Sequence, residues 1–358
     1  MPKTSPQQTG LHKNYVLTVV AICLLASVTT LLFNLLVDPL WFWKGNQLTG
    51  INFTFNERQA KLNLLLQHNE EYDCFIFGSS RATLFQSDSV PGHRCFNLAF
   101  SSGQAEEFVA YAEYLRSLNF QPRLVIVGVD GFNFLQTDRR PLNIPDYVQA
   151  KQNLPGLLAT YLSLDAIRFS WRTVIKKSRR ARYYTARFEC AIQPDAPKFR
   201  PTASLDAEGL VRRSTARNKP SPAFSPAYAT HYQRLRDTFP DARFVAYVPP
   251  ISAWHIDTYD RKGALPGYLD SLHATSQLFD VFWDFSIPSA TTWNPDNTYD
   301  GSHYSVQTNR LVAQALFSQP PDTFGLNVQG LSLHGYTARY REALETFHAV
   351  RRAIEAPP

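Results

Sequence analysis

The chain has 358 residues, of which 44% are hydrophobic and 18% charged, and its 36 basic and 30 acidic side chains leave a net charge of +6. This length and apolar fraction are enough to bury one large core, with or without a cap, so an intrinsically disordered protein is excluded. The 24 prolines and 16 glycines are spread along the chain without an internal repeat, which excludes a solenoid.

The first strong signal in chain order is a run at residues 15–37 that contains no charged side chain. Because about 20 residues of helix cross a bilayer, we expect a transmembrane helix here. Pro39 ends the run, and an aromatic cluster typical of a membrane interface follows at residues 41–43. The polar tail at residues 1–14 and the large remainder are typical of an uncleaved signal anchor with a cytoplasmic tail, and a cleaved signal peptide is the alternative.

The remainder shows an alternation of strand and helix patterns, which predicts a parallel sheet covered by helices. A connector at residues 38–71, with a short amphipathic helix, leads to a domain at residues 72–318 and a helical extension at residues 319–358. Within the domain we expect strands at residues 74–77, 95–100, 124–129, 243–248 and 281–285, and helices at residues 105–118, 228–238 and, capped by Ser305, up to residue 317.

Residues 154–221 interrupt this alternation and are expected to form an insertion or cap over the sheet. Basic and aromatic side chains are mixed in this segment, and Arg179, Arg180 and Arg182 are candidates for substrate binding. Such a surface suits an anionic glycan or anionic lipid headgroups, and a solvated helix face is the equally weighted alternative. Because the domain is expected outside the cytoplasm, nucleic acid is not an expected partner.

Two of the four cysteines, Cys74 and Cys95, each begin a predicted strand. If these strands are neighbours, a disulfide is geometrically conceivable in an oxidising compartment, although two buried free thiols are the favoured expectation. The sequence contains no HExxH motif, no paired CxxC motif and no phosphate or dinucleotide glycine pattern. We therefore expect neither a catalytic metal nor a cofactor.

A Gly-Ser-Ser-Arg sequence at residues 78–81 directly follows the first predicted strand of the domain. An apolar run that stops at a glycine is typical of a buried strand ending in a tight turn, at the edge where open α/β sheets carry their chemistry. Ser80 is the expected nucleophile, and Ser79 is expected only to shape the turn.

Far downstream, Asp300 and His303 form an Asp-x-x-His pattern just before the last predicted core helix. A serine, histidine and aspartate suit acyl transfer, because the hydroxyl attacks, the imidazole takes its proton and the carboxylate fixes the imidazole tautomer. We therefore expect Ser80, His303 and Asp300 to form a catalytic triad. His255 and Asp284, each next to a predicted strand, are second choices.

Acyl transfer also needs hydrogen-bond donors for the oxyanion that forms in the transition state. The backbone amides of Ser102 and Gly103 follow the second predicted strand and are candidates for this role. A purely structural turn between strand and helix is the equally weighted alternative.

These motifs resemble the SGNH/GDSL hydrolase superfamily, and especially its membrane-anchored bacterial branch, which includes proteins of alginate O-acetylation and teichoic-acid D-alanylation. Residues 78–81 look like the Gly-Asp-Ser block, with Ser80 in the nucleophile place. Residues 97–103 are similar to the second block, whose glycine amide serves the oxyanion hole, and residues 128–130 fall where the third block has Gly-x-Asn. The pattern at residues 300–303 matches the last block, Asp-x-x-His.

The sequence departs from this family pattern at two positions. Ser79 replaces an aspartate, which the membrane-anchored branch tolerates. Asp130 replaces the asparagine whose side chain donates to the oxyanion, and an ionised carboxylate cannot donate. Either Asn133 or a backbone amide is then expected to substitute, or activity is weak.

The resemblance implies a three-layer α/β/α, flavodoxin-like domain with a parallel sheet, anchored in the bacterial inner membrane with the domain in the periplasm. It implies a serine esterase or O-acyltransferase acting on an acyl ester or a cell-envelope or exported polysaccharide. Arg81, next to the expected nucleophile, is a further candidate for substrate binding. A multispanning membrane acyltransferase is the implied partner. The alternative is a non-catalytic glycan-binding or scaffolding accessory of an envelope polysaccharide assembly.

Overall fold

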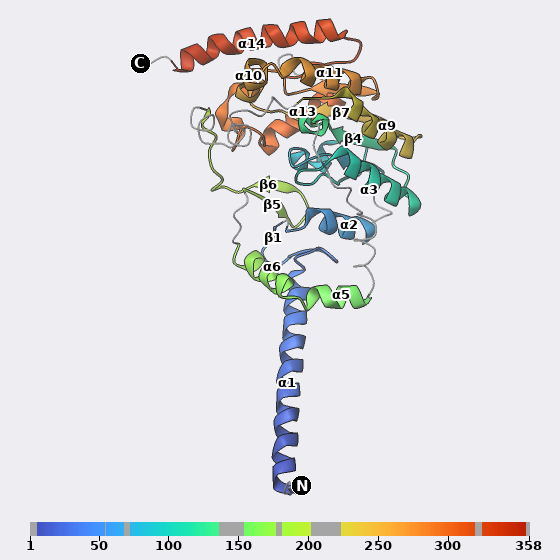
Figure 1. Cartoon of the computed structure of the whole chain (residues 1–358), viewed down its shortest axis with the longest axis vertical. Coiled ribbons are helices and arrows are strands. Elements are labelled where there is room, and N and C mark those ends of the chain that lie inside the picture. The colour runs from blue at the N-terminus through green and yellow to red at the C-terminus, as the bar shows by residue number, and fades with distance from the viewer. Residues whose placement is uncertain are drawn as a thin grey trace.

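The computed structural model describes residues 6–53, 55–67, 72–135, 154–176, 181–201, 223–318 and 324–355, and Figure 1 shows a long helix extending from a mixed α/β domain. This helix, α1, spans Pro6–Val37, and its segment Lys13–Val37 has a mean hydropathy of 2.6. The 25 residues of this segment would span about 37 Å, which exceeds the roughly 30 Å hydrocarbon core of a bilayer. The predicted membrane helix is therefore long and apolar enough to cross a membrane.

The domain is organised around a six-stranded sheet in the order β3-β2-β4-β7-β8-β9. The first five strands are parallel, and β9 pairs with β8 in the antiparallel direction. Counted along the chain, the parallel strands have the order 2-1-3-4-5, one of the two common doubly wound orders. The strands are β2 (Cys74–Phe77), β3 (Cys95–Asn97), β4 (Leu124–Gly128), β7 (Arg243–Val248), β8 (Val281–Asp284) and β9 (Leu326–Asn327).

Helices cover both faces of this sheet, because alternate residues of each strand point to opposite sides. Phe75 and Phe77 of β2 pack into the larger core with α2, α3, α9, α11 and α14, whereas Ile76 packs into a second core with α13. The result is three layers. The helices are α2 (Glu57–Gln67), α3 (Ala105–Ser117), α9 (Ala229–Thr238), α10 (Ala253–Arg261), α11 (Leu265–Ser276), α13 (Val306–Phe317) and α14 (Leu333–Glu355).

A second, three-stranded antiparallel sheet lies between α1 and the large sheet (Figure 1). It joins β1 (Ile51–Asn52), which follows the membrane helix, to β5 (Arg182–Thr185) and β6 (Cys190–Ile192) from the predicted insertion. The other helices of the insertion, α5 (Leu154–Tyr161) and α6 (Leu164–Val174), pack against α1. The described part of the insertion therefore lies mainly on the membrane-helix side of the domain.

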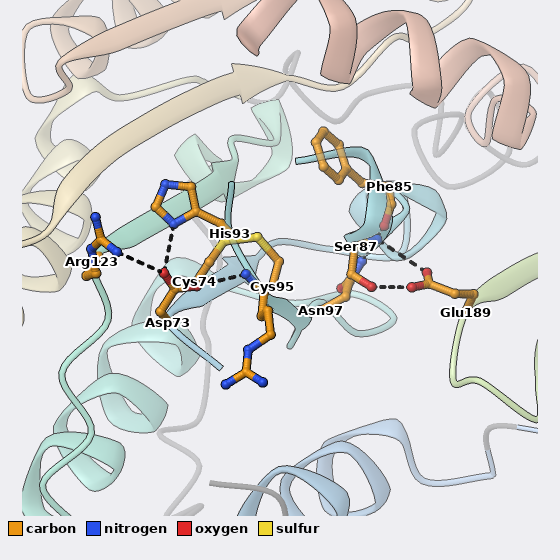
Figure 2. The surroundings of a disulfide bond; sticks show 10 residues. Asp73, Cys74, Phe85, Ser87, His93, Cys95, Asn97, Arg123 and Glu189 are labelled. Carbon is orange, nitrogen blue, oxygen red and sulfur yellow. Dashed lines mark hydrogen bonds and ion pairs between the residues drawn. A yellow bond between two sulfur atoms is a disulfide. The ribbon is translucent and has the colours of Figure 1, made fainter. Parts of the chain in front are cut away.

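Cys74 and Cys95 form a disulfide, so the favoured expectation of two free thiols is wrong. The physical reason is register: the two residues are direct partners in the parallel pairing of β2 and β3. Figure 2 shows this disulfide beside Asp73, towards which His93 and Arg123 both point. The covalent bond thus joins the strand that precedes Ser80 to its neighbour in the sheet.

Candidate active site

Ser80 lies in a tight turn directly beyond the carboxyl end of β2. A Cβ atom at Gly78 would come within 2.5 Å of the Ala82 side chain, so the turn needs glycine there. Ser79 is 1% exposed, and its carbonyl and hydroxyl oxygens accept hydrogen bonds from the amides of Ala82 at 3.0 Å and Arg81 at 3.3 Å. Ser79 therefore shapes the turn, as expected.

The three residues expected to act together are in hydrogen-bond contact. His303 Nε2 lies 2.8 Å from Ser80 Oγ, and His303 Nδ1 lies 2.7 Å from Asp300 Oδ2, although the serine and histidine are 223 residues apart in the chain. The other carboxylate oxygen accepts the amides of Ser302 at 2.9 Å and His303 at 2.8 Å. These bonds leave the imidazole aligned between a carboxylate and a hydroxyl.

The charges around the imidazole favour its neutral form. Burial lowers the pKa of His303, Asp300 raises it, and the positive charges of Arg182 and Arg81 lower it again, with a net shift below the usual value. Burial raises the pKa of Asp300, but its bonds to the His303 ring and to backbone amides give a net lowering. At neutral pH the carboxylate is thus ionised and Nε2 can accept the Ser80 proton.

Tyr299 fixes the plane of the histidine ring. Its ring stacks on that of His303 with 5.4 Å between centroids and 7° between planes. Sequence reasoning did not identify Tyr299, because nothing in an isolated Tyr-Asp pair indicates which ring it covers.

Arg81 connects the serine turn to the aspartate-histidine loop. Its Nε donates to Ser302 Oγ at 2.9 Å, and its Nη1 donates to Asp130 Oδ1 at 2.7 Å. Burial lowers the pKa of Arg81, but the charge of Asp130 outweighs this and raises it. Asp130 therefore holds a guanidinium beside the site.

The backbone candidates for the oxyanion hole are the amides of Ser102 and Gly103. The Gly103 amide donates to the Phe100 carbonyl at 3.0 Å and closes a turn. A Cβ atom at Gly103 would lie 2.6 Å from the Gly78 carbonyl oxygen, so glycine permits the close packing of this turn against the serine turn. Ser102 is exposed, with a positive φ of 55°.

The side chain of Asn133 is engaged within the protein. Its Oδ1 accepts the Ala105 amide at 3.3 Å, and its Nδ2 donates to the Tyr232 hydroxyl at 3.2 Å. Asn133 is also 2% exposed. These bonds give it a structural role at the start of α3 in this structure.

Arg182, one of the predicted substrate-binding residues, contacts the nucleophile turn instead of a free surface. Its Nη1 donates to the Ser80 carbonyl at 2.8 Å and to the Thr83 hydroxyl, and its Nη2 donates to Ser101 Oγ at 3.1 Å. Arg182 thus joins the turn at residue 80 to the loop at residue 101. Arg179 and Arg180 lie outside the described residues.

A buried charge cluster on α2 supports this arrangement and was missed in the sequence. Glu57 accepts the Ser101 amide at 2.6 Å, and Lys61 donates to the Asn97 carbonyl at 2.8 Å. Burial lowers the pKa of Lys61 to about 8. Burial raises the pKa of Glu57, but the charges of Arg182 and Lys61 together with the bonds to Ser101 give a net lowering. The only signal in the sequence is the spacing of four between Glu57 and Lys61, which is equally typical of an exposed helix.

His255, a second choice for the base, bonds elsewhere. Its Nδ1 lies 2.7 Å from Ser252 Oγ, and the Ser252 amide donates to the Gly301 carbonyl at 2.8 Å. Burial and the charge of Arg81 lower the pKa of His255 to about 4, against the opposing effect of Asp300. His255 therefore supports the loop that carries the aspartate, and the Ser80 hydroxyl bonds to His303 instead.

Asp284, the second choice for the acid, holds α14 against the sheet. Its carboxylate accepts the hydroxyls of Tyr336 at 2.5 Å and Tyr340 at 2.6 Å, and the amide of Ser286 at 2.7 Å. Burial raises the pKa of Asp284. The structure thus assigns Asp284 to packing.

Comparison with protein-family models finds no match, and comparison with curated proteins finds none. Among the described residues, no group of three or more His, Cys, Asp or Glu side chains is arranged to hold a metal ion. What the site offers chemically is an activated hydroxyl beside two arginines.

Proposed function

We propose that this chain is a membrane-anchored serine esterase or O-acyltransferase that acts on acyl esters of a cell-envelope or exported polysaccharide. The main support for this proposal is a continuous series of two hydrogen bonds, from Ser80 Oγ to His303 Nε2 at 2.8 Å and from His303 Nδ1 to Asp300 Oδ2 at 2.7 Å. Such a series is the arrangement that activates a hydroxyl for acyl transfer.

In the proposed reaction, Ser80 Oγ attacks the acyl carbonyl while His303 Nε2 takes the hydroxyl proton. The ester bond of the donor then breaks, the donor oxygen leaves with that proton, and the acyl group stays on Ser80. Water or a sugar hydroxyl next gives its proton to His303 and attacks the acyl-enzyme. The bond between the acyl carbon and Ser80 Oγ then breaks, His303 returns the proton to Ser80, and an acid or a new ester is released. Asp300 remains ionised and stabilises the imidazolium in both half-reactions.

Arg81 is the proposed electrostatic partner of the developing oxyanion. Its Nη2 makes no hydrogen bond or ion pair to another residue that the structure describes, while Nε and Nη1 are fixed by Ser302 and Asp130. A positioned cation stabilises an oxyanion more strongly than a neutral amide does. In this scheme Asp130 acts through Arg81 and takes no direct part as a donor.

The SGNH-type, flavodoxin-like assignment is part of this proposal. It is supported by the parallel strand order 2-1-3-4-5 and by the positions of Ser80 after β2 and of Asp300 and His303 before α13. A periplasmic location on a bacterial inner membrane is supported by the apolar helix and by the Cys74–Cys95 disulfide, because disulfides persist in oxidising compartments. A multispanning acyltransferase is the proposed source of acyl groups.

The test uses the full chain in nanodiscs with a chromogenic acetyl ester and with an acetylated polysaccharide. The variant Ser80→Ala should lose ester turnover, and Ser117→Ala, which removes an exposed hydroxyl at the end of α3, should retain it. Equal turnover by wild type and Ser80→Ala would contradict the proposal. Release of acetate separates a hydrolase from a transferase, which instead produces an acetylated acceptor sugar.

A second candidate function is a non-catalytic accessory that binds glycan or scaffolds an envelope polysaccharide assembly. One observation favours it: the Gly103 amide and the Asn133 side chain, two expected oxyanion donors, are engaged within the protein. Polysaccharide modification in cells carrying Ser80→Ala distinguishes the two. Full modification would favour the accessory, and its loss at normal protein abundance would favour the enzyme.

A further inference from the structure

Helices α5 and α6 are fastened to the last turns of the membrane helix. Leu31 and Leu35 of α1 pack in one apolar cluster with Leu157 of α5 and Phe169 of α6. Asn34 donates from within the apolar segment to the carbonyl of Tyr161, the last residue of α5, at 2.7 Å. This bond satisfies a carbonyl that a helix end otherwise leaves without a partner.

The same attachment continues just beyond the membrane segment. Asp38 accepts a hydrogen bond from the Tyr161 hydroxyl and from the amides of Phe42 at 2.8 Å and Gly45 at 2.8 Å. The carboxylate thereby joins the end of α1, the following turn and α5 in one buried cluster. The positions of α5 and α6 relative to α1 are consequently fixed by both polar and apolar contacts.

These contacts define the depth of the corner between α5 and α6. Asn34 precedes Val37, the end of the apolar segment, by three residues, or about 4.5 Å of helix. The corner begins at Tyr161, whose carbonyl is bonded to Asn34. If α1 crosses a bilayer, the corner lies at the boundary between acyl chains and headgroups.

The outer surface of this corner is apolar and exposed. Leu164 is 83% exposed, Trp171 is 60% exposed, and both belong to α6. Two exposed leucines of α5 and two residues flanking α6 extend the surface, which we call the α5–α6 face. It consists of Leu154, Leu158, Leu162, Leu164, Trp171 and Ile175.

Basic side chains border this face. Arg168 and Arg172 are four residues apart on α6, and Lys176 follows the helix, whereas Asp165 is the only acidic residue between residues 154 and 176. A tryptophan and leucines next to arginines are typical of helices that lie in a membrane interface, with the basic groups at the lipid phosphates. Figure 1 shows α5 and α6 on either side of the domain end of α1.

We propose that the α5–α6 face is embedded in the interface of the leaflet from which the domain emerges. Its occupant is lipid: acyl chains contact the leucines and Trp171, and phosphates contact Arg168 and Arg172. The membrane then holds the domain through three helices and fixes its orientation, with the small sheet and Arg182 on the membrane side of Ser80. The proposal does not depend on the proposed enzymatic function.

The test places a nitroxide at position 164 of the full chain in nanodiscs of phosphatidylcholine and phosphatidylglycerol. The variant Leu164→Cys is made with Cys23→Ser, which removes the exposed thiol, while Cys190 is buried. Leu118→Cys is the matched control, because Leu118 is also an exposed leucine, at 42%, but follows α3 on another part of the domain. At each position, the collision rate of the nitroxide with oxygen, which partitions into lipid, is compared with its collision rate with a water-soluble nickel complex.

The proposal predicts a severalfold higher ratio of oxygen to nickel collisions at position 164 than at position 118. Equal ratios would overturn it, and protection of position 164 from both reagents would mean that protein, a partner or a second copy, covers the face. Quenching of tryptophan fluorescence by lipids brominated on the acyl chain gives a second readout, which needs no label at residue 164. The wild type should lose more emission than Trp171→Phe, and equal quenching of the two would also overturn the proposal.

Discussion

The carbonyl oxygen of Ser80 accepts a hydrogen bond from Arg182 Nη1 at 2.8 Å, which connects the small membrane-side sheet to the turn of the candidate nucleophile. The same guanidinium reaches Ser101 Oγ at 3.1 Å. Two loops that follow neighbouring parallel strands are thus held together by one residue from the insertion. Arg182 is a positioning residue in this account, because it acts through the serine turn.

We expect Arg182→Gln to lower kcat by about 100-fold, because small misplacements of a nucleophile are costly. Loss of the Arg182 guanidinium also removes charge-assisted hydrogen bonds, so the free energy of unfolding should fall by about 2 kcal/mol. Steady-state kinetics and thermal unfolding of the full chain measure both effects. Arg187→Gln, at an exposed position of the same hairpin, is the control and should change neither.

Replacing the acid of the triad tests its orienting role. Asp300→Asn keeps the side-chain shape but cannot hold His303 in the tautomer that accepts the Ser80 proton, so kcat should fall by about 10⁴-fold. Ester turnover measures the effect, with Asp296→Asn, an exposed neighbour, as the control. A loss below tenfold would show that His303 does not depend on this carboxylate.

The pH dependence follows from the lowered pKa of His303. The base works when neutral, so kcat/KM should stay level as the pH falls through 6.5 and decline only below it, where the imidazole protonates. Arg182 disfavours the imidazolium, and its removal should raise the pKa of His303 and move the decline to higher pH. A decline that stays in place or moves to lower pH in Arg182→Gln would contradict this assignment of charges.

The disulfide gives a prediction about stability and compartment. Removing it with Cys74→Ala and Cys95→Ala together should lower the free energy of unfolding by about 3 kcal/mol, measured by denaturation in detergent. Thiol alkylation of the wild type after denaturation in cells should modify only Cys23 and Cys190. Modification of all four cysteines without a reductant would place the domain in a reducing compartment.

The sequence predicted the elements whose patterns are local. The apolar runs at residues 74–77 and 243–248 are strands with those bounds, and Ser305 caps α13 by accepting the Thr308 amide at 3.1 Å. Alternation of such runs with helix patterns was enough for a mostly parallel sheet. Helices α10 and α11 and the short strands β1, β5, β6 and β9 were not predicted, because their residues are too few or too mixed in polarity.

The site residues whose roles were not predicted from the sequence are those whose partners come from distant parts of the chain. Arg182 carries the same local pattern as a solvated basic residue, and only the fold brings it against Ser80 and near Glu57. The pairing of Cys74 with Cys95 depends on strand order and register, which strand propensity does not encode. In the sequence, Asp130 stands where a donor side chain was expected. Its ion pair with Arg81 could not be predicted, because it depends on the pairing of β4 with β2.

Covalent labelling of the full chain with a serine-reactive fluorophosphonate, followed by mass spectrometry of the modified peptide, tests directly whether Ser80 is an activated nucleophile. We predict one modified residue, Ser80, with labelling abolished in Ser80→Ala and strongly slowed in His303→Ala. Labelling that persists in Ser80→Ala, or a folded wild type that does not react, would contradict the assignment of Ser80 as an activated nucleophile.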